Sequence, residues 1–178
     1  MKLYSLDERC VPAIKRVREY YLSVPEWRKD VEEGKMFGVL IYEDPVSNGK
    51  DSLSYLAAFS GTLGGKTCQS GFVPPVFDIQ GEGRYFLEEE AEISAINRYL
   101  DSGQATPREV CDLKHERKER SRALQRWLFA RYSVSNISGE KSSLLDIFAP
   151  AVPPGGAGDC CAPKLLQEAF RRGIRPLA

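Results

Sequence analysis

The chain has 178 residues and no net charge, since 25 basic side chains balance 25 acidic ones. Its mix of 42% hydrophobic and 28% charged residues is typical of a folded globular protein and excludes a disordered, fibrous or coiled-coil chain. The longest apolar run, Met36–Tyr42, is far shorter than the roughly 20 residues that span a membrane. The N-terminus also lacks the apolar core of a signal peptide. We therefore expect a cytoplasmic protein with no membrane partner.

Charge is unevenly distributed along the chain. Residues 1–106 contain 12 Lys/Arg and 17 Asp/Glu, whereas residues 107–178 contain 13 and 8. Such an asymmetry indicates two modules with different partners.

The five cysteines are scattered and odd in number: Cys10, Cys68, Cys111, Cys160 and Cys161. With no C-x-x-C spacing and only one histidine, His115, they predict reduced thiols and neither a metal site nor a cofactor. Cys160 and Cys161 precede a predicted helix, a position that can activate a thiol. No general base or further ligand is evident, so packed thiols are the favoured interpretation, and His115 is expected on the surface.

Hydrophobic spacing, prolines and glycines predict the elements of the first half of the chain. We expect the first 33 residues to be helical in two pieces, one that ends at Pro25 and a short helix at Glu26–Glu33. Antiparallel strands at Met36–Tyr42 and Leu53–Ser60, joined by a loop at 44–51, and an extended segment at Phe72–Phe77 should follow. Ser60–Thr67 ends in Gly-Lys-Thr like a phosphate-binding loop. Its first residue is not glycine and prolines follow in place of a helix, so a glycine turn is favoured over a nucleotide site.

The second half begins with clear helical signals. Glu88–Leu100 has helical spacing, and Thr106, Pro107 and Glu109 form a capping box that starts a helix running to Tyr132, about 39 Å long. Beyond it we expect a hairpin of Tyr132–Ile137 and Leu144–Phe148, a helix at Pro163–Arg172 and an extended stretch from Ile174. The predicted fold is α+β: a helix, hairpin and helix module (1–104), a long basic helix (105–132) and a small hairpin, loop and helix module (133–178), truncated or frayed at its C-terminus.

The long helix carries the candidate binding site. Between Lys114 and Arg122 it has no apolar residue, so this stretch cannot pack on all sides. Residues spaced by four form one stripe that can follow phosphates. The candidate RNA-binding residues are Lys114, Arg117, Lys118, Arg122 and Arg126. The alternative is a solvated helix whose charges are partly neutralised by Glu116 and Glu119.

Several segments resemble the N-terminal extension of bacterial RluA-type RNA pseudouridine synthases. The resemblance is carried by Gly34–Leu40, Tyr55–Gly61, Phe72–Asp78, Gly155–Leu166 and Gly173–Ala178, and it also includes the basic helix. It implies a parent enzyme that isomerises uridine in tRNA or rRNA, with a catalytic domain C-terminal to this region as a partner.

The family's catalytic His-Arg-Leu-Asp motif is absent, because Glu116 follows the single histidine. No catalytic residue can be transferred, and this chain alone should be inactive. The C-terminal module also resembles half of a nucleic-acid deaminase fold, without its zinc ligands or its catalytic glutamate. We expect a non-catalytic region that helps to bind or orient RNA. The alternative is a structural or protein-interaction module with no nucleic-acid role.

Overall fold

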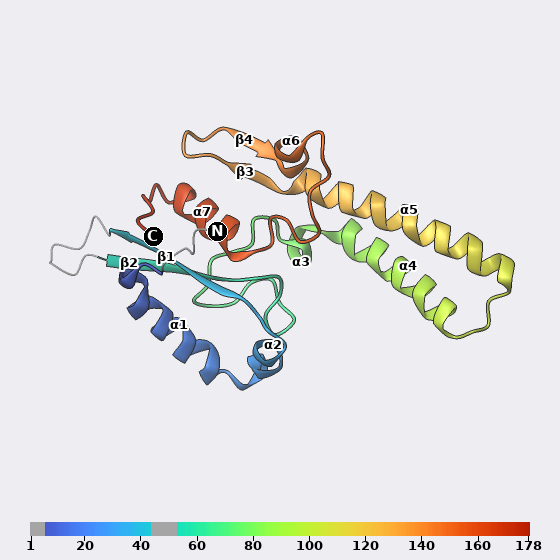
Figure 1. Cartoon of the computed structure of the whole chain (residues 1–178), viewed down its shortest axis with the longest axis horizontal. Helices are drawn as coiled ribbons and strands as arrows, with labels where there is room; N and C mark the ends of the chain where they lie inside the picture. The colour runs from blue at the N-terminus through green and yellow to red at the C-terminus, as the bar shows by residue number, and fades with distance from the viewer. Residues whose placement is uncertain (1–5, 44–52) are drawn as a thin grey trace. The chain divides into compact units, whose positions relative to one another are not determined.

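The computed structural model describes residues 6–43 and 53–178, and its fold is α+β as predicted (Figure 1). The expected loop at 44–51 lies outside the described residues. No helix in the described ranges is both long enough and apolar enough to cross a membrane.

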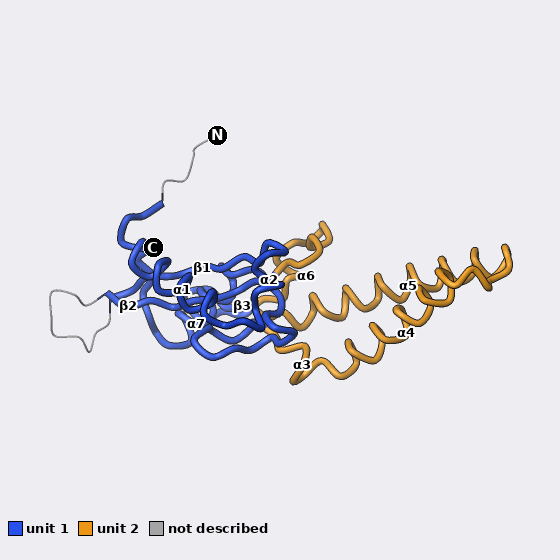
Figure 2. Tube along the Cα trace, turned by 90° about the horizontal axis from the view of Figure 1, so that it is seen from below, with its two compact units in different colours: residues 1–76, 134–141, 158–178 blue, residues 77–133, 142–157 orange. Residues whose placement is uncertain are grey.

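Contacts divide the chain into two compact units (Figure 2). Unit 1 contains Met1–Val76, Val134–Lys141 and Gly158–Ala178, and unit 2 contains Phe77–Ser133 and Ser142–Ala157. This division differs from the one at 104 and 132 that composition suggests. The reason is that helix α7 (Cys161–Arg171) packs against strands about a hundred residues earlier, a contact that composition does not reveal.

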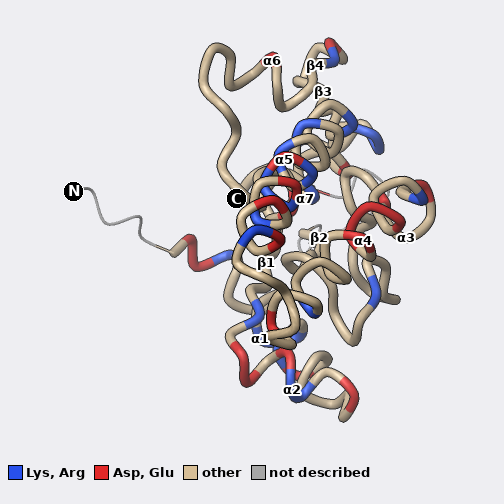
Figure 3. The backbone as a smooth tube through the Cα atoms, turned by 90° about the vertical axis from the view of Figure 1, so that its right-hand side faces the viewer, with Lys and Arg blue, Asp and Glu red and all other residues tan. Residues whose placement is uncertain are grey.

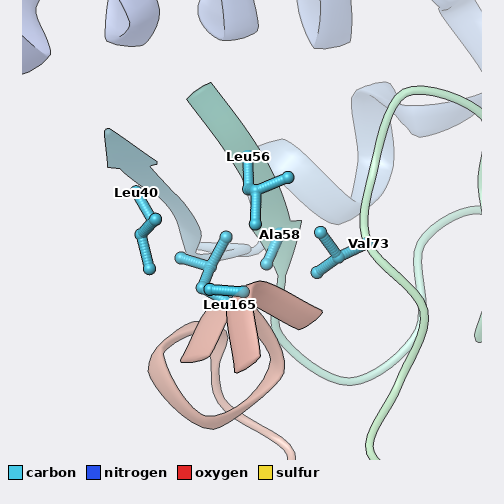
Figure 4. Packing of buried hydrophobic residues seen from close by; sticks show 6 residues of the cluster. Leu40, Leu56, Ala58, Val73 and Leu165 are labelled. Carbon is cyan, nitrogen blue, oxygen red and sulfur yellow. The ribbon is translucent and has the colours of Figure 1, made fainter. Parts of the chain in front are cut away.

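Unit 1 is built on the antiparallel strands β1 (Phe37–Glu43) and β2 (Leu53–Phe59), with Phe37 opposite Phe59 and Glu43 opposite Leu53. Alternate side chains face opposite sides of the sheet, so each side has its own apolar cluster. Helix α7 covers one side, where the buried cluster consists of Leu40, Leu56, Ala58, Val73, Leu165 and Ala169 (Figure 4).

Gly38 explains how closely α7 approaches β1. A Cβ atom at this position would lie 2.7 Å from the Cβ of Cys161, closer than real side chains pack. Beyond α7, the chain returns to the sheet: the amide of Leu177 donates to the carbonyl of Ile41, and the amide of Ile41 donates to the carbonyl of Ala178. These bonds confirm the extended stretch predicted after Ile174.

An aromatic cluster covers the other side of the sheet. Trp27, Phe59 and Leu63 are buried there, and Tyr21 stacks on Phe37 with ring centroids 4.0 Å apart. These residues come from β1, β2, the loop after β2 and the N-terminal helical region. That region consists of a 3-10 turn at Glu8–Cys10, α1 (Val11–Ser23), a second turn at Pro25–Trp27 and α2 (Arg28–Glu32).

The segment Ser60–Thr67 forms a tight turn and not the start of a helix. Backbone hydrogen bonds join Leu63 and Lys66 in both directions across Gly64 and Gly65, which have positive φ angles of 57° and 72°. The glycine turn favoured from the sequence is therefore confirmed.

Unit 2 contains α3 (Ile79–Glu82) and two paired long helices, α4 (Arg84–Asp101) and α5 (Pro107–Arg131). Thr106 and Glu109 form the predicted capping box at the start of α5. Short strands β3 (Ser133–Ser135) and β4 (Lys141–Ser143) follow as a hairpin, of which residues Val134–Lys141 belong to unit 1.

The prediction of a strand at Leu144–Phe148 was wrong. This segment is helix α6, because Ser143 caps its N-terminus and the carboxylate of Asp146 accepts hydrogen bonds from the Ser143 amide and hydroxyl. Helix α7 also begins two residues before the predicted start at Pro163.

Candidate nucleic-acid interface

The predicted stripe lies on an exposed side of α5. Lys114, Lys118, Arg122 and Arg126 are all exposed. At about 1.5 Å per residue, the stripe is about 18 Å long. Among the described residues, Lys114, Lys118 and Arg126 have no carboxylate within 4.0 Å, whereas Arg122 forms an ion pair of 2.8 Å with Glu119. Three of the four charges are therefore available to an external anion.

Arg117, the fifth candidate, has a different environment. It is half-buried, and its Nη1 donates to Oδ1 of Asn97 on α4 at 2.9 Å. Nearby Arg120 donates to Glu89 of α4 at 3.0 Å and to Glu116 at 2.8 Å. These two hydrogen bonds raise the pKa of Arg120, and the hydrogen bond to Glu116 has the larger effect. Both arginines therefore join α5 to α4 and are not part of the exposed stripe.

The two long helices have opposite charge. Helix α4 contains five acidic and two basic residues, and α5 contains eight basic and four acidic residues. Figure 3 shows the acidic positions gathered on α4. At 100° per residue, the centre of the stripe lies roughly opposite the side of α5 that carries Arg117 and Arg120. The ion pair of Arg120 with Glu89 therefore lies on the side of α5 that faces α4, and the stripe lies on the other side.

Sequence reasoning missed an aromatic cluster near the end of α5. The guanidinium of Arg131 lies 3.7 Å from the ring centroid of Trp127, and Tyr85 of α4 lies 5.1 Å from the same ring. Tyr85 is exposed. The spacing of four residues between Trp127 and Arg131 is the signal that predicts their contact on a helix. Such rings can stack on unpaired bases, although Trp127 lies on a different side of α5 from the stripe.

Unit 1 contains a second charged cluster, around a buried lysine. The side chain of Lys164 is 2% exposed, and its Nζ donates to the carbonyls of Phe59 at 3.0 Å and Gly61 at 3.3 Å. The carboxylate of Asp159 is 3.5 Å away. Every buried side-chain nitrogen and oxygen in the described ranges has a hydrogen-bond partner. Lys164 thus joins α7 to the end of β2, and we assign it a structural role.

The cysteines near α7 are not arranged as a reactive site. Burial raises the pKa of the Cys161 thiol, whose Sγ lies 3.5 Å from the carbonyl oxygen of Ala58 and 3.6 Å from that of Met36. A protonated thiol that faces two carbonyls is a weak donor and a poor nucleophile. Cys160 and His115 are exposed, and all five cysteines are free. Within the described part of the chain, no three His, Cys, Asp or Glu side chains are grouped as metal ligands.

No family model, curated protein or solved structure matches this chain.

Proposed function

We propose that this chain is a non-catalytic RNA-contacting region of a larger RNA pseudouridine synthase. The observation that supports this proposal is the position of Lys114, Lys118 and Arg126. These cations are exposed on the side of α5 that faces away from α4, and no carboxylate of residues 6–43 and 53–178 lies within 4.0 Å of them. Arg122 adds a fourth charge, which Glu119 partly neutralises.

A stripe of this kind suits a polyanion better than a small ligand. Its cations follow one another at intervals of about 6 Å along one side of a helix, as the phosphates of a nucleic-acid backbone do at a similar spacing. Phosphate contacts of this type position a nucleic acid without reading its sequence. We therefore expect salt-dependent binding with little sequence preference, at about micromolar affinity or weaker.

A structural or protein-interaction role is the second candidate, and one observation favours it. Arg117 and Arg120 already have partners on α4, so a share of the basic residues of α5 stabilises the helix pair. Under this alternative, removal of the exposed charges would leave RNA binding unchanged.

The decisive experiment removes the stripe without altering the helix pair. A variant with Lys114→Gln, Lys118→Gln, Arg122→Gln and Arg126→Gln keeps the helix propensity of α5. A matched variant replaces four exposed cations of unit 1 by Gln and loses the same net charge: Lys15, Arg16, Arg28 and Arg175. Fluorescence anisotropy with a labelled single-stranded RNA, over a range of salt concentrations, gives the affinity and its salt dependence.

For the parent chain, the logarithm of affinity should fall with the logarithm of salt concentration at a slope near −3, about −0.7 for each of four contacts. The stripe variant should lose most of this slope, and the control should keep it. Equal binding by parent and stripe variant would refute the RNA role. Because the catalytic motif is absent, neither protein should form pseudouridine in tRNA or rRNA, and turnover above background would overturn the non-catalytic assignment.

A further inference from the structure

One edge of β1 has backbone groups without a hydrogen-bond partner in the part of the chain that the structure describes. In an antiparallel pair, the backbone groups of alternate residues point towards the partner strand. The amide of Ser60 donates to the carbonyl of Met36, so the even-numbered residues of β1 face β2 and Phe37, Val39 and Ile41 face the other edge. Ile41 is bonded there to residues 177 and 178. The outward groups of Phe37 and Val39 have no partner in the described ranges.

A hollow lies beside this free edge. It has a volume of about 220 Å³, and it is lined by residues of α1 and β1 and by Lys35, which precedes β1; among the others are Ile14, Arg18, Tyr21, Phe37 and Val39. Further apolar side chains are exposed on the same side of α1, namely Val11 at 42% and Leu22 at 58%. An extended segment beside the edge would place alternate side chains against this apolar surface.

Residues 176–178 show which strand direction this edge of β1 accepts. Pro176 lies opposite Tyr42 in an antiparallel bridge, so residues 176–178 run towards lower residue numbers along β1. A strand that continues this line would next meet Val39 and then Phe37. Arg18 is exposed beside the hollow and has no acidic partner among the residues that the structure describes, so it suits an acidic side chain.

We propose that the β1 edge at Phe37–Val39 binds an extended acidic peptide segment as an added antiparallel strand. Backbone hydrogen bonds to Phe37 and Val39 would give affinity. The side chains of every second peptide residue would face the hollow, which would accept apolar ones, and Arg18 beside it would favour an acidic one on the same side. This surface is separate from the α5 stripe, so its test does not depend on RNA binding.

The experiment uses the full chain labelled with ¹⁵N and a synthetic peptide, acetyl-Thr-Val-Thr-Glu-Thr-Val-Thr-amide, in which Val, Glu and Val share one face of an extended strand. One control peptide has Lys in place of Glu, and another is N-methylated at every internal amide, so that these backbone groups cannot donate hydrogen bonds. We expect the first peptide to shift the amide signals of Phe37 and Val39 and to slow their hydrogen exchange. The methylated peptide should not bind.

Charge variants test the proposed selectivity. Arg18→Glu should weaken binding of the Glu peptide by about two- to five-fold and strengthen binding of the Lys peptide. Arg16→Glu is the matched control, since Arg16 is exposed on the opposite side of α1. It should change neither affinity.

Four results would overturn the proposal. They are equal binding of the methylated peptide, shifts confined to residues outside α1 and β1, no binding of either unmethylated peptide at about 1 mM, and concentration-dependent shifts of Phe37 and Val39 without peptide. The last result would instead show that the edge pairs with a second copy of this chain.

Discussion

Replacing Lys164 by Met tests whether the buried ammonium stabilises unit 1. The substitution keeps the length of the side chain and removes the donor of two hydrogen bonds, to the carbonyls of Phe59 and Gly61. Hydrogen bonds from a charged group each contribute about 1.5–3 kcal/mol, and part of this is offset because a charge is no longer buried. We expect the free energy of unfolding to fall by about 2–4 kcal/mol.

The measurement is urea unfolding followed by the fluorescence of Trp27. This residue is buried in the aromatic cluster with Phe59 and so reports on unit 1. The second tryptophan, Trp127, belongs to unit 2 and is replaced by Phe in parent and variants alike, so that the transition of unit 1 is seen alone.

Two further variants serve as controls for Lys164→Met. Lys15→Met changes an exposed lysine of α1 and should alter the free energy of unfolding by less than about 0.5 kcal/mol. Asp159→Asn removes only the long 3.5 Å ion pair and should cost less than about 1 kcal/mol. If Lys164→Met were as stable as the parent within about 0.5 kcal/mol, the assigned role of the ammonium would be refuted.

Three other predictions concern α7 and its surroundings. Hydrogen bonds from Arg171 lower the pKa of Glu168 most, those from Arg172 add to the effect, and burial opposes it. The stabilisation by Glu168 should therefore be complete above its ordinary pKa of 4.5 and be lost as pH falls through the lowered value. The urea midpoints of Glu168→Gln and of the parent should then converge in acid, and a difference that stays constant with pH would contradict this. Gly38→Ala should cost about 1–3 kcal/mol in the same urea assay, since its methyl group would overlap α7, and an unchanged midpoint would disprove the close packing. Mass spectrometry after iodoacetamide treatment should show slow alkylation of Cys10 and Cys161, because burial raises the pKa of both thiols, and fast alkylation of the three exposed cysteines. The denatured, unreduced protein should have five reactive thiols, and a smaller number would indicate a disulfide.

Local signals in the sequence predicted much of the secondary structure. The capping box at Thr106, the proline at 25 and the glycines after β2 each constrain the backbone over a few residues, so their effects can be recognised without tertiary information. Helix α6, which we predicted as a strand, also has a local signal in the sequence. Ser143 followed by Asp146 is the spacing of a capping box, but the short apolar run at 144–148 fits a strand equally well.

Tertiary contacts were harder to predict. The lack of apolar residues between Lys114 and Arg122 correctly indicates exposure of the stripe. Arg117 is not part of the stripe because its side chain binds Asn97 of α4. Which residue of α4 lies opposite Arg117 depends on the register of the two helices, and no local sequence pattern specifies that register. Lys164 is a similar case, because an amphipathic helix pattern places a lysine in solvent. Its burial follows from carbonyls at the end of β2, more than a hundred residues away in the chain.

The distance along the chain between β2 and α7 has a consequence for synthesis on the ribosome. About one hundred residues separate Phe59 from Cys161, and translation at about 5–20 residues per second adds them in about 5–20 s. During this interval the nascent hairpin has no α7 to cover Leu40, Leu56 and Ala58, while the paired helices α4 and α5 emerge with most of their own contacts. We therefore expect unit 2, whose residues lie between the segments of unit 1, to fold first. Unit 1 should expose apolar surface until α7 has emerged, so newly made chains should be most prone to aggregation or to chaperone binding before that point.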